Sequence, residues 1–415
     1  MLQRIISCFV LLILYANLWS QDTVSIFFIG NSFTYFNNMP GMVEDFAAEA
    51  GIPCYVQMHA PGGASVGDTA NYAHMDDPFV YDQINSSDWD FIVVQDNQGR
   101  FVLDYGVFSG ASRTIEGHLM LRDSALANNH CTRMVWFAGW GWKNGYPPYG
   151  NTGTEVIQRI WANYTFLNDT AGEIISPIGA AWIRAINQLP QVDLWAADET
   201  HPSVYGSYLT AGVIFTSIFR VNPVQLTYNA GINASEAEQL RTYAWEAVND
   251  SLVSTNLDQY CPELFYDTLN NQLIADSLYS YYHWYFNDQP VLSGPDHCFQ
   301  NVQPGFYCVI AEDSAACLFR SFEIQINPLI IEEMNYTEFI YLYPNPVSNE
   351  LFLKKPAALR IDSYCIYSST GMKMLENKYE NPSTILIPDF IWSGLYIIQF
   401  KTTQGILTYR IIVDR

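Results

Sequence analysis

The stretch VSIFFIGNS at residues 24–32 decides the fold expected for the first half of this sequence. It is a short, continuously apolar run that ends in Gly-Asn-Ser, and a helix is expected to follow at Pro40. Such a run, bounded by a turn signal, is typical of a strand buried on both faces of a parallel sheet. Gly30 permits a tight turn, so we expect Ser32 at the carboxyl end of the first strand, where open α/β sheets bind ligands.

Outward from this stretch, short apolar runs alternate with helical stretches up to about residue 220, which predicts a parallel sheet covered by helices on both faces. The predicted strands are Val24–Ile29, Pro53–Met58, Asp90–Gln95, Arg133–Ala138 and Glu173–Ile178. The predicted helices are Pro40–Ala50, Phe108–Asn128, Thr154–Asn168, Ser203–Phe219 and a closing helix, Ser235–Val253. We therefore expect residues 21–253 to form one three-layer α/β/α domain.

The segments on either side of this domain have a different character. Residues 1–20 carry one basic residue and a short apolar run, which predicts a cleaved signal peptide, with no transmembrane segment in the mature chain. Residues 256–328 contain short β-prone runs with turn signals, which predict a small β-sandwich. This region resembles the immunoglobulin-like modules of exported Bacteroidetes enzymes, with a tryptophan at 284 and a Gly-x-Tyr-x-Val strand from Gly305.

Composition excludes several kinds of partner. The 415 residues carry a formal net charge of −23, so no basic surface is expected for nucleic acid or anionic lipid. Seven cysteines remain after the signal peptide, and four lie between 261 and 317, where one or two local disulfides are plausible but the pairing is open. Because no Cys/His metal spacing occurs, a structural zinc site is not expected, and the chemistry considered below requires neither a metal nor a cofactor.

A second polar motif offers a base for the serine hydroxyl. A serine needs one because its hydroxyl is protonated at neutral pH and is a poor nucleophile. Asp198 and His201 stand three residues apart just before a predicted helix, which Pro202 and Ser203 would begin. We expect Asp198 to hold one imidazole nitrogen of His201 while the other faces the sheet edge.

Taken together, Gly-Asn-Ser after the first strand and Asp-x-x-His-Pro-Ser before the last helix resemble the pattern of SGNH (GDSL-like) hydrolases. The resemblance implies a flavodoxin-like domain with a five-stranded parallel sheet and a catalytic triad of Ser32, His201 and Asp198. Asn31 stands where the family more often has aspartate. In this respect the chain resembles a subgroup of bacterial members that has Gly-Asn-Ser.

The same resemblance implies an oxyanion hole formed by the amides of Ser32 and Gly63 and the side chain of Asn97. Gly62 and Gly67 are the alternative glycines. Gln95 replaces a family glycine and Gln98 a family aspartate, and Gln95 is the alternative donor or substrate contact if Asn97 points away.

Aromatic residues follow the fourth predicted strand, and the carboxyl ends of strands face such a site. Trp140, Trp142 and Tyr146 are therefore expected to wall it and to pack against sugar surfaces. The favoured hypothesis is a secreted esterase that removes O-acetyl groups from a polysaccharide. The alternatives are a lipase or thioesterase on the same site, or a surface carbohydrate-binding protein without catalysis.

The last eighty residues carry a separate set of motifs. Tyr-Pro-Asn-Pro at 343–346, Gly-Leu-Tyr at 394–396 and a basic residue at 410 occur in the order found in type IX secretion C-terminal sorting domains, which residues 336–415 resemble. This resemblance implies export through the type IX secretion machinery to the exterior or the cell surface.

Overall fold

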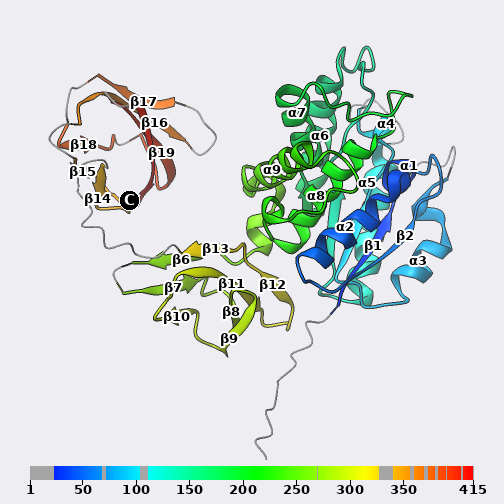
Figure 1. Cartoon of the computed structure of the whole chain (residues 1–415), viewed down its shortest axis with the longest axis horizontal. Coiled ribbons are helices and arrows are strands. Elements are labelled where there is room, and N and C mark those ends of the chain that lie inside the picture. The colour runs from blue at the N-terminus through cyan, green and yellow to red at the C-terminus, as the bar shows by residue number, and fades with distance from the viewer. Residues whose placement is uncertain are drawn as a thin grey trace, which may run out of the picture. The chain divides into compact units, whose positions relative to one another are not determined.

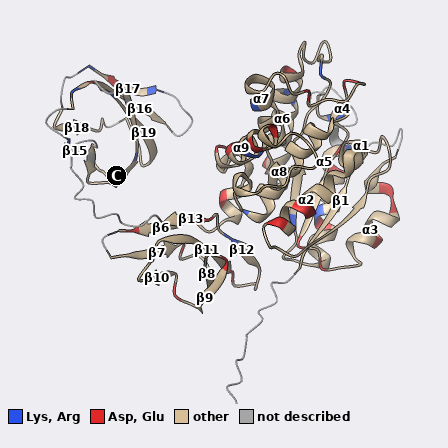
Figure 2. Ribbon diagram, in the orientation of Figure 1, with Lys and Arg blue, Asp and Glu red and all other residues tan. Residues whose placement is uncertain are grey.

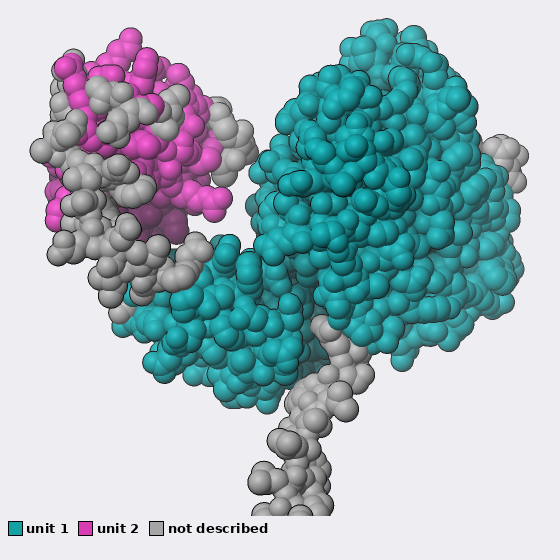
Figure 3. Space-filling view, viewed as in Figure 1, with its two compact units in different colours: residues 1–327 teal, residues 328–415 magenta. Residues whose placement is uncertain are grey.

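The computed structural model describes the chain in two compact units, residues 1–327 and 328–415 (Figure 3). Within them the described residues are 23–67, 72–102, 111–268, 270–326, 340–355, 359–368, 373–378, 382–388, 390–402 and 405–414. The predicted signal peptide lies outside the described residues.

A parallel sheet of five strands forms the centre of the α/β domain (Figure 1). Its strands are β1 (Val24–Ile29), β2 (Cys54–His59), β3 (Phe91–Val94), β4 (Arg133–Phe137) and β5 (Ile174–Ser176), in the order β2-β1-β3-β4-β5. This flavodoxin-like order confirms the predicted fold class. Strand order reverses between β1 and β3, the switch point at which such sheets bind ligands.

Two apolar cores cover the two faces of this sheet. Alternate residues of β1 enter different cores, with Ile26 and Phe28 on one face and Phe27 and Ile29 on the other. The first core is completed by α2 (Met39–Glu49), α7 (Ile178–Gln188), α8 (Val204–Phe219) and α9 (Ala234–Asn249). The second is completed by α3 (Pro78–Ile84), α5 (Ala111–Asn128) and α6 (Gly153–Ala171).

Several helices differ from the sequence-based expectation, among them α3 and α7. The predicted strand Glu173–Ile178 ends at Ser176, and α7 begins at Ile178, because the apolar run at this point continues into the buried face of a helix. Short α3 was not predicted, and its N-terminus is marked by Asp77, whose side chain caps the Phe79 N–H, and by Pro78.

Short antiparallel strands follow α9 and form two sheets. One contains β6 (Leu264–Asp267), β7 (Gln272–Ala275) and β10 (Cys298–Gln300). The other contains β8 (Tyr281–Phe286), β9 (Gln289–Gly294), β11 (Gly305–Glu312), β12 (Leu318–Arg320) and β13 (Ile324–Ile326). Side chains from both sheets, among them the fully buried Trp284, form one core.

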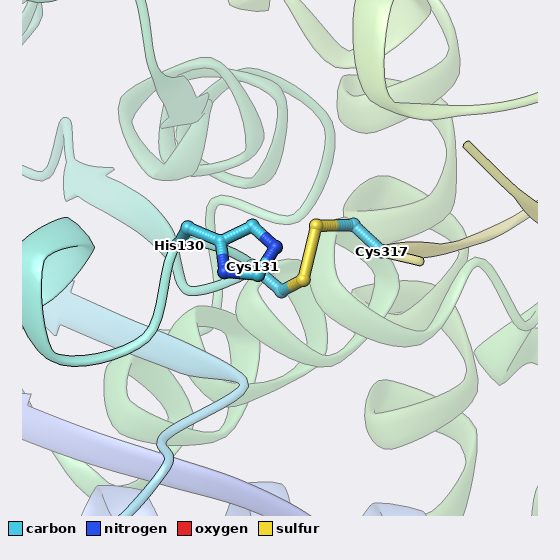
Figure 4. Close-up of side chains that lie close together, drawn as sticks. All are labelled: His130, Cys131 and Cys317. Atoms are coloured by element: carbon cyan, nitrogen blue, oxygen red, sulfur yellow. A yellow bond between two sulfur atoms is a disulfide. The ribbon is translucent and has the colours of Figure 1, made fainter. Parts of the chain in front are cut away.

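The disulfide in this unit corrects the sequence-based expectation. Cys317 is bonded to Cys131, 186 positions earlier, and not to a cysteine of its own cluster (Figure 4). The bond joins the loop before β4 to the β domain, and His130 Nε2 lies 3.0 Å from the Ala315 carbonyl beside it. Although His130 lies close to both sulfur atoms, the disulfide consumes the two thiols that could have held a metal.

The second unit is a separate β-sandwich. One of its sheets contains β14 (Tyr341–Tyr343), β15 (Glu350–Lys354) and β18 (Thr384–Leu386). The other contains β16 (Ile361–Ser368), β17 (Lys373–Asn377), β19 (Gly394–Thr402) and β20 (Gly405–Val413). Asn345 of the Tyr-Pro-Asn-Pro motif accepts a hydrogen bond from the Ile412 N–H at 2.7 Å, so the motif is attached to the last strand. Lys and Arg are sparse along the ribbon of the chain (Figure 2).

Candidate active site

Ser32, His201 and Asp198 meet at the carboxyl edge of the parallel sheet. His201 Nε2 lies 2.8 Å from Ser32 Oγ, and His201 Nδ1 lies 2.6 Å from Asp198 Oδ2. The segments that carry Ser32 and His201 are 169 positions apart in sequence. A serine, an imidazole and a carboxylate in this geometry can act as a nucleophile, a base and the group that orients the base.

The loop that contains His201 is ordered by the carboxylate of Asp198. Asp198 Oδ1 accepts hydrogen bonds from the backbone N–H groups of Thr200, at 3.0 Å, and His201, at 2.9 Å. Burial works to raise the pKa of Asp198, but these hydrogen bonds and the nearby imidazole outweigh it and lower the pKa to about 2. Asp198 is therefore negatively charged at neutral pH and can stabilise a positive charge on His201.

Buried side chains hold the nucleophile segment from both sides. Gln95 Oε1 accepts hydrogen bonds from the Asn31 N–H at 2.8 Å and from Thr34 Oγ1 at 3.0 Å. His74 Nε2 lies 2.8 Å from the Gly30 carbonyl, and burial lowers the pKa of His74 to about 4, so Nε2 of the neutral ring donates this bond. The turn that presents Ser32 is thus fixed in the interior.

The hydrogen bonds of the Asn31 side chain explain why asparagine suits this position. Its side-chain oxygen accepts the Phe33 N–H at 3.0 Å, and its Nδ2 donates to the Ala64 carbonyl at 2.8 Å. An aspartate carboxylate could accept the first bond but could not donate the second. Asn31 therefore ties the nucleophile segment to the loop that contains Gly63.

A pocket of about 220 Å³ opens over the serine. Only two of its lining residues, Phe33 and Trp142, have large apolar side chains. The lining residues are Asn31, Ser32, Phe33, Gly63, Asn97, Gln98, Gly99, Gly141, Trp142, Thr200 and His201.

Of the three candidate glycines, the structure brings Gly63 to this pocket. Gly63 lines it with a left-handed backbone (φ 71°), a conformation that favours glycine. A Cβ at Gly67 would lie 2.1 Å from the carbonyl oxygen of Arg113, so Gly67 allows close packing against α5. Neither Gly62 nor Gly67 lines the pocket.

Asn97 also lines the pocket, at the N-terminus of α4 (Gln98–Phe101). Its Oδ1 accepts a hydrogen bond from the Gly99 N–H at 3.0 Å. Because the oxygen is committed to this cap, the amide NH₂ is the group that Asn97 can offer to a ligand.

Asp96 is a part of the site that the sequence-based prediction missed. Its Oδ1 accepts the N–H groups of Val66, at 2.7 Å, and Asn97, at 2.6 Å, and so joins the Gly63 loop to the Asn97 loop. The residue is fully buried, and this burial raises its pKa to about 7 against the two hydrogen bonds. Its position beside Gln95 and Asn97 was the available signal, but nothing local shows which of three adjacent polar side chains points inward.

Two of the predicted substrate contacts are wrong. Trp140 is fully buried, stacks on Phe33 and Trp182, and donates from Nε1 to the Thr200 carbonyl. Gln95 is 1 % exposed and supports the nucleophile segment, as described above. Gln95 directly follows β3 (Phe91–Val94) and Trp140 lies three residues past β4 (Arg133–Phe137), and the loops at these strand ends turn both side chains into the interior.

The other two aromatic residues are placed differently. Trp142 lines the pocket beside Gly99, and Tyr146 stacks on Trp142 with ring centroids 4.4 Å apart. Tyr146 is 43 % exposed and does not line the pocket itself.

Comparison with known families identifies the kind of domain at the C-terminal end of the chain. Residues 341–414 match the family model described as the secretion system C-terminal sorting domain. The chain is thus directed through type IX secretion to the cell surface or exterior, as predicted. No helix among the described residues is long and apolar enough to cross a membrane.

The α/β domain is distantly similar to solved structures. A DUF4886 family protein from Bacteroides uniformis is 16 % identical, with a TM-score of 0.47, over 55 % of this chain and 95 % of its own. An acetyl xylan esterase is 10 % identical (TM-score 0.37, 47 % and 100 % covered). A carbohydrate esterase family 3 protein from Talaromyces cellulolyticus is 13 % identical (TM-score 0.35, 48 % and 97 % covered). No curated protein sequence matches the chain.

Proposed function

We propose that the α/β domain is a serine esterase that works through an acyl-enzyme on Ser32. The observation that carries this proposal is the continuous path from Ser32 Oγ to His201 Nε2, at 2.8 Å, and from His201 Nδ1 to Asp198 Oδ2, at 2.6 Å. A serine that only caps a helix, or a histidine with only a structural role, does not require these two short contacts. Proton transfer from Ser32 to His201 requires both.

The reaction proceeds in two acyl transfers. His201 removes the Ser32 proton as Oγ attacks the ester carbonyl, and the imidazolium that forms is stabilised by Asp198. His201 then protonates the leaving alcohol, and a water molecule, deprotonated by the same imidazole, releases the acid from Ser32.

The negative charge on the tetrahedral intermediate needs donors. The Ser32 and Gly63 N–H groups and the Asn97 NH₂ are assigned this role because all three residues line the pocket. Removing one such donor typically costs about 10²- to 10³-fold in kcat. Asn31 joins the Ser32 segment to the Gly63 loop, and Asp96 joins the Gly63 loop to the Asn97 loop, through the hydrogen bonds described above.

The pocket favours a short acyl group on a polar alcohol. Apart from Phe33 and Trp142, it is lined by polar side chains and glycines, which give a long hydrocarbon chain little to pack against. Together with export by the sorting domain, this supports O-deacetylation of a polysaccharide outside the cell.

The test is hydrolysis of p-nitrophenyl acetate and octanoate, and release of acetate from an acetylated polysaccharide, by the purified chain and its Ser32→Ala variant. We expect the acetyl ester to be the better substrate and Ser32→Ala to be inactive on both. A preference for octanoate would instead indicate a lipase or thioesterase. Glycan binding without hydrolysis in the unaltered chain would indicate a carbohydrate-binding protein.

A further inference from the structure

The segment just after the nucleophile contacts the base directly. The Phe36 ring stacks on the His201 imidazole with centroids 4.1 Å apart and planes 10° apart. On another side, Phe33 meets the same imidazole edge to face at 5.6 Å. Two rings from the serine segment therefore confine the imidazole that lies 2.8 Å from the serine.

Asn37 attaches the same segment to the backbone around the base. Its Nδ2 donates to the Pro202 carbonyl at 3.1 Å and to Ser207 Oγ at 2.9 Å. Ser207 Oγ in turn donates to the Phe36 carbonyl at 3.3 Å. Asn37 has φ 54°, a left-handed conformation that asparagine tolerates, so the backbone turns here and brings the side chain to the base loop.

We propose that Phe36 and Asn37 are positioning residues that hold the His201 imidazole in line with Ser32. Stacking restricts rotation of the ring about its χ2 bond, which would otherwise move Nε2 away from Oγ. The hydrogen bonds of Asn37 restrict the distance between the two segments. The far side of the base loop is fixed separately, by the bond from Trp140 Nε1 to the Thr200 carbonyl.

The same arrangement suits the charged state of the base. When His201 becomes an imidazolium, the face of Phe36 offers its π-electrons to the cation. The ring also excludes water from one face of the imidazole. Substrate does not need to touch Phe36 or Asn37 for either effect, so the expected signature is a lower kcat with little change in KM.

Because this role rests on the proposed esterase activity, the full chain is first assayed with p-nitrophenyl acetate. In Phe36→Leu, we expect kcat to fall about tenfold at nearly constant KM, since a displacement of ~1 Å at a reacting group can cost up to about 100-fold. Phe36→Tyr, which keeps the aromatic face, restores most of the rate. The proton NMR signal of the His201 Nδ1–H broadens in Phe36→Leu and stays sharp in Phe36→Tyr.

Asn37→Gly removes the side chain while accepting the left-handed backbone, and we expect a several-fold lower kcat. Its matched control is Asn38→Gly, because Asn38 has the same backbone conformation (φ 55°) and gives α2 no side-chain cap. A control for Phe36→Leu is Phe79→Leu, which removes a ring that packs against another histidine, His59, with centroids 4.8 Å apart and planes tilted by 50°. Both controls are expected to keep the wild-type kcat.

The outcomes separate the two proposals. If the unaltered chain hydrolyses no ester, the proposed function fails. If the chain is active but Phe36→Leu matches Phe36→Tyr, or Asn37→Gly matches Asn38→Gly, the positioning role fails and the esterase stands. A fall in kcat together with a lower melting temperature in Phe36→Leu, both unrelieved in Phe36→Tyr, also overturns the positioning role.

Discussion

At the carboxyl edge of the parallel sheet, hydrogen bonds from buried polar side chains join the segments after β1, β2 and β3, whereas the amino edge is attached to the β domain. There, the guanidinium of Arg133 lies 5.3 Å from the ring centroid of Tyr260 and 4.7 Å from that of Phe319, near the Cys131–Cys317 disulfide. The His201 side chain at the carboxyl edge remains 26 % exposed. Under the proposed function, the carboxyl edge carries the chemistry and the amino edge fixes the β domain, so substitutions at the two edges should separate activity from stability.

The largest effect is expected from His201→Ala at the carboxyl edge. Without the base, Ser32 keeps its proton, and kcat/KM for p-nitrophenyl acetate should fall on the order of 10⁴-fold. The melting temperature should change little, because the imidazole is partly exposed. Activity within tenfold of wild type would remove this edge from the chemistry.

Asn97→Asp should cost about 10²- to 10³-fold in kcat. The substituted side chain keeps an oxygen to cap the Gly99 N–H but has no NH₂ to offer an oxyanion. Steady-state kinetics beside a thermal melt separate the two roles: an unchanged kcat would show that the cap is the whole purpose of Asn97.

Gly63→Ala and Gly62→Ala compare two neighbouring glycines. Gly63 has φ 71° and Gly62 has no left-handed backbone, so alanine strains the first position and not the second. We expect kcat to fall about tenfold in Gly63→Ala through movement of the donor amide, and to stay at the wild-type level in Gly62→Ala. The reverse ranking in the same assay would assign the donor to Gly62.

Asp96→Asn tests the carboxyl group that joins the Gly63 loop to the Asn97 loop, through the pH dependence of stability. Burial raises the pKa of Asp96 from 3.8 to about 7, so between these values the folded chain holds a proton that the unfolded chain has released. This carboxyl's contribution to the free energy of unfolding therefore decreases as pH rises from about 4 to about 7.

Asparagine has no such titration and can still accept both N–H groups. In urea unfolding, Asp96→Asn should gain stability relative to wild type as pH rises across this window. A difference that is constant with pH would mean that Asp96 does not titrate there.

The smallest effect on activity is expected at the amino edge. The double variant Cys131→Ser/Cys317→Ser should lose about 2 to 4 kcal/mol of stability. Its kcat should equal that of the wild type, because the disulfide lies before β4 and the site lies after the strands. A tenfold fall in kcat at a temperature where the variant is folded would show that the edges are coupled.

Much of the fold could be predicted because the apolar runs are local signals. Strand β1 matches its predicted bounds, and Ser32 and His201 meet as their motifs suggested. The direction of side chains just past a strand end could not be predicted, because it depends on where the strand stops and how the loop turns. Trp140 and Trp142, two residues apart, therefore lie in the core and in the pocket respectively.

Contacts between segments far apart in the chain could also not be predicted from the sequence. The pairing of Cys131 with Cys317 depends on how the β domain docks, and the clustering of cysteines near Cys317 pointed to a local bond instead. The stacking of Phe36 on His201 likewise follows from two turns that meet only in the folded chain.

The most direct measurement is the site of covalent labelling by a fluorophosphonate, which reacts with a serine only where a base activates it. Peptide mass spectrometry of the labelled full chain should place the adduct on Ser32, and His201→Ala should abolish it. An adduct on another residue, or one on Ser32 that persists unchanged in His201→Ala, would contradict the assignment of these two side chains as nucleophile and base.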